Sequence, residues 1–279
     1  MSKGGRLKMT ADLSQAGRAS RSRRALLVTL TVMLTSAAWL PPAHADLPDT
    51  VANIKPSILV VGTYRNTDSP RFRMRGTGFV VGDGNLAITN AHVLPEATEN
   101  MEGMSIVVQV RRPSGELSMR QVTLLEVDRV HDLALMRFEG ASAPAMRVRN
   151  SDTVREGQAV AFMGFPIGGA LGFSPVTHRA LISSIAPAAL PTPNARTLNA
   201  ATIRSVRAGP FNIFQLDGTA YPGNSGGPLF DPDTGEVLGV VNMVFIKGSR
   251  ESALSQPSGI SYAIPSKFVA DILEHGQRK

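Results

Sequence analysis

Short apolar runs separated by turn residues constrain the fold of this chain more than any other feature. The runs are four to eight residues long, and glycines, prolines and charged residues interrupt them. Such spacing is typical of the strands of an all-β barrel. The runs form two sets, which cover residues 57–61, 78–81, 86–89, 104–110, 122–127 and 133–138, and then 159–162, 180–185, 212–216, 237–244 and 261–264. We therefore predict two β-barrels of similar size.

A predicted β-hairpin in the first set leads into a histidine. Residues 76–81 precede the turn sequence Gly82-Asp83-Gly84-Asn85, and the apolar residues 86–89 follow it. Two apolar runs joined by a turn of this kind form a hairpin. His92 follows the second run directly, so the hairpin would hold it on a rigid support. We predict His92 as a general base.

An aspartate opens the last apolar run of the first set. Asp132 directly precedes residues 133–138, and His131 comes before it. His131 competes with His92 for the role of base. The place of Asp132 at the start of a strand suits a carboxylate that orients a histidine better than it suits His131 as the base.

Glycines surround Ser225 in the segment 223–230, which reads Gly-Asn-Ser-Gly-Gly-Pro-Leu-Phe. They permit a tight turn and leave room for a substrate carbonyl beside the hydroxyl group. On this segment alone, a hairpin turn without chemistry is the alternative. The segment also fits the G-x-S-x-G pattern of α/β-hydrolases, but in that fold the serine precedes the acid and the histidine. Here His92 and Asp132 come first.

Three motifs in the same order resemble those of chymotrypsin-fold serine peptidases of the HtrA/Deg type. They are Thr-Asn-Ala-His-Val at 89–93, Asp-Leu-Ala-Leu at 132–135 and Gly-Asn-Ser-Gly-Gly-Pro-Leu at 223–229. The resemblance implies an all-β fold of two six-stranded antiparallel barrels with a C-terminal helix. It also implies that His92 is the general base, Asp132 orients it and Ser225 is the nucleophile. The oxyanion hole would be formed by the backbone N–H groups of Gly223 and Ser225.

The resemblance also predicts the substrate-binding residues and the chemistry. Thr219, six residues before Ser225, would lie at the floor of the primary pocket, where it offers no carboxylate to a basic side chain. With Ala220 and Met243 it predicts cleavage after small or aliphatic residues. No metal or cofactor is required. An inactive protease fold that binds partners, and an acyl-ester hydrolase that uses the same three residues, remain alternatives.

Residues 1–45 have the composition of an export signal. Basic residues that include Arg23 and Arg24 precede an apolar run at 25–40, and Ala43-His44-Ala45 fits a cleavage site. The 16-residue run is short for a membrane span, although a retained anchor is the alternative. The arginine pair resembles a twin-arginine signal, and ordinary secretory export fits as well. We expect a periplasmic or secreted protein of the bacterial envelope.

Removal of this segment changes the charge balance. The whole chain has a formal net charge of +7, but residues 46–279 hold 22 Lys and Arg against 21 Asp and Glu, a net charge of +1. This balance argues against nucleic acid as a partner. We expect protein or peptide substrates and no stable membrane association after cleavage. The chain has no cysteine, so the barrels must be stable without disulfides.

We expect residues 46–279 to form one protease domain. The N-terminal barrel would cover about 50–150, the C-terminal barrel about 155–265 and a closing helix about 266–276, with the apolar face of the helix on the second barrel. Residues 186–207 have no strand pattern and predict a long surface loop, with or without a binding role. Only 54 residues follow Ser225, so we expect no PDZ domain. The oligomeric state is left open.

Overall fold

The described residues of the computed structural model are 46–96, 99–169, 172–188, 211–242 and 261–277. They belong to Ala45–Lys279, one of the two units into which the chain divides. The predicted export signal, residues 1–45, therefore lies outside the described residues, as does Met243. None of the helices within the described ranges is long and apolar enough to cross a membrane.

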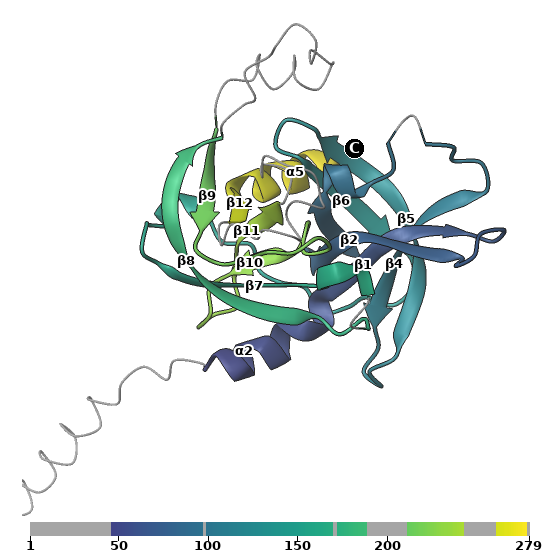
Figure 1. The fold of residues 1–279 in the computed structure, drawn as a ribbon, viewed down its shortest axis with the longest axis horizontal. Helices are drawn as coiled ribbons and strands as arrows, with labels where there is room; N and C mark the ends of the chain where they lie inside the picture. Colours follow the sequence, from purple (N-terminus) through teal and green to yellow (C-terminus); the bar gives the residue numbers. More distant parts are fainter. Residues whose placement is uncertain (1–45, 97–98, 170–171, 189–210, 243–260, 278–279) are drawn as a thin grey trace, which may run out of the picture. The chain divides into compact units, whose positions relative to one another are not determined.

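The first barrel is closed and has six strands (Figure 1). Around the barrel the strands follow the order β1-β2-β3-β6-β5-β4, and every neighbouring pair is antiparallel. The predicted hairpin is confirmed, since β2 pairs with β3 and Val81 lies opposite Leu86. The strands are β1 (Ile58–Arg65), β2 (Phe72–Val81), β3 (Leu86–Asn90), β4 (Met104–Arg111), β5 (Leu117–Asp128) and β6 (Leu133–Phe138).

The second barrel is also closed, with six antiparallel strands in the order β10-β11-β12-β9-β8-β7. The predicted fold class is thus confirmed. The strands are β7 (Ala159–Gly164), β8 (Val176–Pro187), β9 (Asn212–Leu216), β10 (Pro228–Phe230), β11 (Val237–Asn242) and β12 (Ser261–Pro265). β10 was not predicted, because three residues are too few to show a period of two. β8 includes Ala186 and Pro187, so the expected loop begins later, and residues 189–210 lie outside the described residues.

Several strands are buried on both faces, which explains why their sequences are continuous apolar runs. In β1, Leu59 and Val61 belong to the core of the first barrel. Their neighbours Ile58 and Val60 belong instead to a cluster that we call the inter-barrel core. Each fully buried aliphatic or aromatic side chain of this kind contributes about 1.5–3 kcal/mol.

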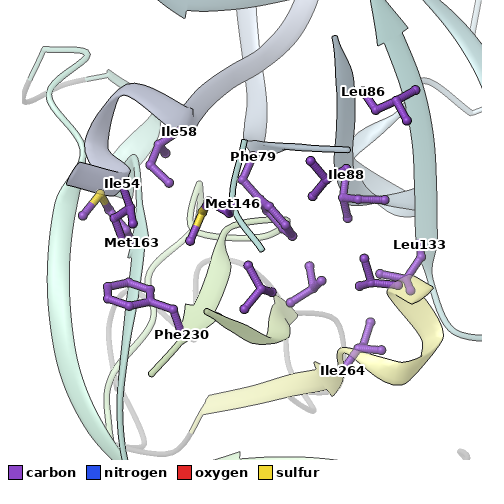
Figure 2. Packing of buried hydrophobic residues seen from close by; sticks show 14 of the residues in the cluster. Ile54, Ile58, Phe79, Leu86, Ile88, Leu133, Met146, Met163, Phe230 and Ile264 are labelled. Atoms are coloured by element: carbon purple, nitrogen blue, oxygen red, sulfur yellow. The ribbon is translucent and has the colours of Figure 1, made fainter. Parts of the chain in front are cut away.

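The inter-barrel core joins residues from both barrels (Figure 2). Phe79, Ile88 and Leu133 come from the first barrel, and Phe230 and Ile264 from the second. Because these side chains pack in one cluster, the two barrels are held together by apolar contacts as well as by the hydrogen bonds described below.

Two helices pack against the inter-barrel core. The helix α2 (Leu47–Ile54) was not predicted, although Pro48 in its first turn and apolar residues at positions 47, 51 and 54 are typical of a helix start and an apolar face. The predicted C-terminal helix is confirmed as α5 (Lys267–Gln277). It packs on β5 and β6 of the first barrel as well as on β12, so the prediction that it packs on the second barrel alone was wrong.

Four short 3₁₀ helices complete the described elements: η2 (Lys55–Ser57), η3 (Ala91–Val93), η4 (Ser151–Thr153) and η5 (Pro166–Gly169). Of these, η3 matters most for function, because it follows β3 directly and carries His92.

Candidate active site

His92 and Asp132 come together because their strands are paired. β3 runs antiparallel to β6, with Asn90 opposite Leu133. The carbonyl oxygen of Asp132 accepts hydrogen bonds from the backbone N–H of Ala91, at 3.1 Å, and from Nδ2 of Asn90, at 3.0 Å. The backbones of His92 and Asp132 are therefore held together by the pairing of β3 with β6 and by the two hydrogen bonds beyond the end of that pairing.

The carboxylate of Asp132 binds His92 twice. Oδ2 lies 2.6 Å from Nδ1 of the His92 ring, and Oδ1 accepts the backbone N–H of the same residue at 2.8 Å. An ionised carboxylate only accepts hydrogen bonds, so Nδ1 carries the proton in this contact. Nε2 of a neutral His92 is then free to accept a proton, which a general base requires.

Asn242 supplies the third hydrogen bond to this carboxylate, and the sequence predicts it only as part of the apolar run 237–244. It is fully buried at the end of β11, and its Nδ2 donates to Oδ2 of Asp132 at 2.7 Å. The second barrel therefore holds a side chain of the first. A polar residue at the end of a buried apolar strand was the signal that could have found it.

Asp132 has a strained backbone. Its φ angle is +53°, in the left-handed region that residues other than glycine adopt only at a cost, although this cost is smaller for asparagine and aspartate. The hydrogen bonds to its carbonyl and carboxylate oxygens compensate for that cost. Strain of this kind collects where a side chain must point in one direction.

The glycines around Ser225 serve the packing of the two barrels. Gly226 has a φ angle of +85°, and a Cβ atom there would overlap with the carbonyl oxygen of Thr77 and with Oγ1 of Thr89. Our prediction assigned these glycines to substrate access, whereas Gly226 is also required because the loop lies directly against β2 and β3.

Thr77 fastens this loop to the first barrel. Its backbone N–H donates to the carbonyl oxygen of Ser225 at 2.9 Å, and its Oγ1 donates to the carbonyl oxygen of Gly223 at 2.6 Å. The same Oγ1 accepts the backbone N–H of Phe165 at 3.1 Å. This role could not be predicted from the sequence, because Thr77 and Gly223 are 146 residues apart.

These contacts bring Ser225 close to the backbone that carries His92. A Cβ atom at Gly76 would lie 2.7 Å from a methyl carbon of Val93 and 2.9 Å from the carbonyl oxygen of Ser225, so both residues flank the same point. Ser225 is only 6% exposed. No acceptor among the described residues binds the backbone N–H of Gly223 or Ser225, and Gly223 has a φ angle of +104°.

The residues predicted for substrate binding lie in different surroundings. Thr219 is partly exposed in the loop between β9 and β10. Ala220 is 5% exposed, packs in the core of the second barrel, and its N–H donates to Oγ of Ser261 at 2.7 Å. Within the described ranges no group of three or more metal-ligating side chains occurs.

His131, the competing candidate for the base, forms a separate pair. Its Nδ1 lies 2.5 Å from Oδ2 of Asp128, and its ring stacks on Phe268 of α5 with a centroid distance of 3.8 Å. Burial raises the pKa of Asp128, but hydrogen bonds from His131 and Val130 outweigh burial and hold that pKa below its usual range.

Comparison with known proteins agrees with this geometry. The trypsin-like peptidase domain matches residues 76–240. The mitochondrial serine protease HTRA2 of Drosophila willistoni is 32% identical over 204 residues, which cover 73% of this chain and 39% of that protein. For HTRA2 of Drosophila erecta the identity is 31%, with 73% and 40% covered. This chain thus spans about two fifths of the length of these curated relatives.

Solved structures share the fold. The HtrA-type protease AlgW, solved with a tripeptide, superposes with a TM-score of 0.56 at 24% identity, over 82% of this chain and 62% of that one. At this identity the likeness concerns the fold alone, and the family assignment rests on the matched domain and on the HTRA2 relatives. The chain belongs to the trypsin-like serine peptidases, and the relatives reported above are of the HtrA type.

Proposed function

We propose that the protein is a serine endopeptidase that hydrolyses peptide bonds with His92, Asp132 and Ser225. The observation that carries the proposal is the position of the His92–Asp132 pair, whose ring and backbone contacts hold His92 where the adjoining Val93 and Ser225 flank the same point. The loop of Ser225 is bonded to Thr77 of the same barrel. Neither family membership nor the serine motif alone would support catalysis as strongly.

The proposed cycle follows from these contacts. Nε2 of His92 takes the proton of the Ser225 hydroxyl group while the oxygen attacks the peptide carbonyl carbon. The resulting imidazolium is stabilised by the ionised Asp132, and it then gives its proton to the leaving amine. Water, activated by His92, attacks the acyl-enzyme in the same way and releases Ser225.

Two backbone N–H groups would stabilise the tetrahedral intermediate. Those of Gly223 and Ser225 are engaged by no acceptor among the described residues, which supports them as donors to the oxyanion. Thr77 supports this role indirectly, because it fixes the carbonyl oxygens of the same two residues. Preorganised donors of this kind are worth about 10²–10³ in kcat.

The proposed specificity is for small or aliphatic residues before the scissile bond. Thr219 carries no charge, so it cannot form an ion pair with a Lys or Arg side chain in the primary pocket. Met243 is proposed as a wall of that pocket from the sequence alone. Ala220 is buried, so we propose that it shapes the primary pocket through its small size and not through an exposed surface.

We also propose a location in the bacterial envelope, periplasmic or secreted, on the basis of the sequence of residues 1–45. The tests are the N-terminal sequence of the protein isolated from a bacterial expression host and its distribution between cell fractions. A protein that begins at Asp46 and appears outside the cytoplasm would support the proposal. Retention of the first 45 residues would contradict cleavage of the signal.

The activity is tested with residues 46–279 and the matched variant Ser225→Ala. A fluorophosphonate probe should label the wild-type protein and leave the variant unlabelled. Casein should be cleaved by the wild type alone, at a rate at least about 10³-fold above that of the variant.

The other outcomes separate the alternative functions. A wild-type protein that folds but takes up no probe would contradict catalysis and support a binding module. Labelling with rapid hydrolysis of simple esters, but no cleavage of casein or of peptides, would support an acyl-ester hydrolase. Cleavage predominantly after Lys or Arg would contradict the proposed primary pocket.

A further inference from the structure

A cavity of about 440 Å³ opens beside His92 and is built from the first barrel alone. Its lining contains three arginines and two carboxylates in addition to the histidine. These residues are Arg65, Arg73, Arg75, Asp68, Glu99 and His92. Neither Thr219 nor Ala220, proposed for the primary pocket, lines this cavity, so it is separate from that pocket.

The cavity borders His92, past which the leaving group departs in the proposed mechanism. In the proposed mechanism His92 gives its proton to the leaving amine, so the peptide beyond the scissile bond must pass its ring. Asn242 of the second barrel binds the Asp132 end of the pair, whereas His92 lines the cavity together with other residues of the first barrel. This inference therefore rests on the proposed function.

One of the three arginines is fully engaged. Arg75 donates to the carbonyl oxygens of Val93 and Leu94, at 2.7 and 3.1 Å, and makes two contacts of 2.9 and 3.0 Å with the carboxylate of Glu99. Arg75 and Glu99 thus form an ion pair without net charge that holds the segment after His92 in place. Because each neutralises the other, neither is proposed to bind a charged ligand.

The other two arginines share one carboxylate. Asp68 lies 3.4 Å from Nε of Arg73 and 3.8 Å from a terminal nitrogen of Arg65. Arg65 also donates to the carbonyl oxygen of Asn100. The side chain of Arg73 is 61% exposed, and no described residue accepts a hydrogen bond from its two terminal nitrogens. Arg65, Arg73 and Asp68 together therefore have one excess positive charge, and Arg73 is the arginine whose terminal nitrogens can bind a ligand.

We infer that this recess, the Arg65–Arg73 pocket, binds a carboxylate on the leaving-group side of the scissile bond, with Arg73 as the anchor. The planar guanidinium group can hold a carboxylate through two parallel hydrogen bonds. The carboxylate belongs to an Asp or Glu side chain within the first three residues after the scissile bond, or to a free chain end at the same distance. The pocket therefore determines specificity independently of the primary pocket.

The test uses quenched fluorescent peptides that share one sequence before the scissile bond. Glu, Gln or Lys is placed in turn at each of the three positions after it, with the C-terminus amidated. For the wild type, kcat/KM should be about two- to fivefold higher with Glu than with Gln at one of these positions. The preference should weaken as the salt concentration rises.

The variants Arg73→Gln and Arg73→Glu assign the effect. The first should remove the preference for Glu, and the second should reverse it in favour of Lys. Arg147→Gln is the matched control, because that arginine is 87% exposed and its ion pair with Glu236 spans 3.8 Å. It should keep the preference of the wild type.

A second arm distinguishes the source of the carboxylate. Peptides without acidic residues are compared with an amidated and a free C-terminus three residues after the scissile bond. A preference for Glu in amidated peptides supports recognition of a side chain, and a preference for the free acid alone supports recognition of a chain end. Loss of either preference in Arg73→Gln supports the pocket.

Binding to Ser225→Ala keeps the inference separate from catalysis. Leaving-group peptides with Glu or Gln are titrated by fluorescence anisotropy, and tighter binding of the Glu peptide that requires Arg73 supports the pocket even without turnover. Equal rates and equal affinities for Glu and Gln, in a protein whose cleavage depends on Ser225, would overturn the pocket and leave the peptidase intact. A carboxylate preference confined to positions before the scissile bond would overturn it as well.

Discussion

Two His–Asp pairs meet around the start of β6, where Asp128, His131 and Asp132 lie within five residues of sequence, and the pairs have almost the same local geometry. In the pair of His92 and Asp132, Nδ1 lies 2.6 Å from the carboxylate, and in that of His131 and Asp128 it lies 2.5 Å away. In both pairs the backbone N–H of the histidine also donates to the carboxylate, and the histidine side chains are 24% and 22% exposed. Neither the hydrogen bonds within each pair nor the exposure of its histidine separates the two pairs.

What differs is the surroundings of each imidazole ring. His131 stacks on Phe268 and has Phe211 against it edge to face, with a centroid distance of 4.7 Å. His92 lines the cavity described above, and the side chain of the adjoining Val93 flanks the same point beside Gly76 as the carbonyl oxygen of Ser225. A hydrogen-bonded His–Asp pair is therefore a common structural unit, and access to a nucleophile and a substrate makes it a candidate for catalysis.

The largest expected effect separates the two carboxylates. Asp132→Asn should lower kcat by about 10⁴-fold, because an amide no longer fixes the tautomer of His92 or stabilises its charged form. Asp128→Asn is the matched control and should change kcat less than about twofold. Peptide cleavage by both purified variants measures this, and similar losses in the two would break the comparison.

Removal of Asn242 tests the partner that only the first pair has. Asn242→Ala takes one hydrogen bond from the ionised carboxylate of Asp132, and bonds to charged groups contribute about 1.5–3 kcal/mol. We expect kcat to fall about 10- to 100-fold. The control is Asn85→Ala, which removes the bonds from Nδ2 to two carbonyl oxygens in a turn far along the barrel. It should leave kcat unchanged, and an unchanged kcat in Asn242→Ala would show that Asp132 is held without it.

Thr77 tests whether the nucleophile loop must be fastened beside the first pair. Thr77→Val leaves the carbonyl oxygen of Gly223 and the N–H of Phe165 without their partner, which should lower the free energy of unfolding by about 1–3 kcal/mol. Urea denaturation measures the loss, and peptide cleavage should fall with it. Thr77→Ser keeps the hydroxyl group and should restore both, so failure of the serine variant would attribute the effect to the lost methyl group.

The smallest expected effect concerns pH and the second pair. The pKa of Asp128 is lowered in the folded protein, so the charged carboxylate stabilises the fold above the ordinary carboxyl pKa of 3.8. That contribution is lost as the pH falls below this value and through the lowered pKa. Wild type should therefore be more stable than Asp128→Asn by about 1–2 kcal/mol at pH 7, and the difference should shrink towards pH 3. A difference that stays constant would assign the effect to packing.

The fold could be predicted from the sequence because its signals are local. The hairpin of β2 and β3 depends on residues that are neighbours in the chain, and the motifs around His92, Asp132 and Ser225 are each complete within eight residues. These motifs placed the candidate residues on the correct elements. They could not give the contacts between the elements.

The residues that sequence analysis missed act over long distances. Asn242 bonds to Asp132 across 110 positions, and Thr77 bonds to Gly223 across 146. Neither residue type is unusual for a strand, so only the docking of the barrels shows their roles. The same reason explains why the packing of α5 on the first barrel was missed, because its apolar residues join a core that both barrels form.

The bond between Thr77 and the loop of Ser225 also governs when the protein can become reactive. It joins one strand of the first barrel to a segment that is synthesised long after it. A nascent chain with only the first barrel folded holds His92 and Asp132 but lacks Ser225, the proposed nucleophile. Contacts between distant parts of a chain slow folding. In the proposed mechanism, hydrolysis therefore requires both barrels, and activity would report the completed fold.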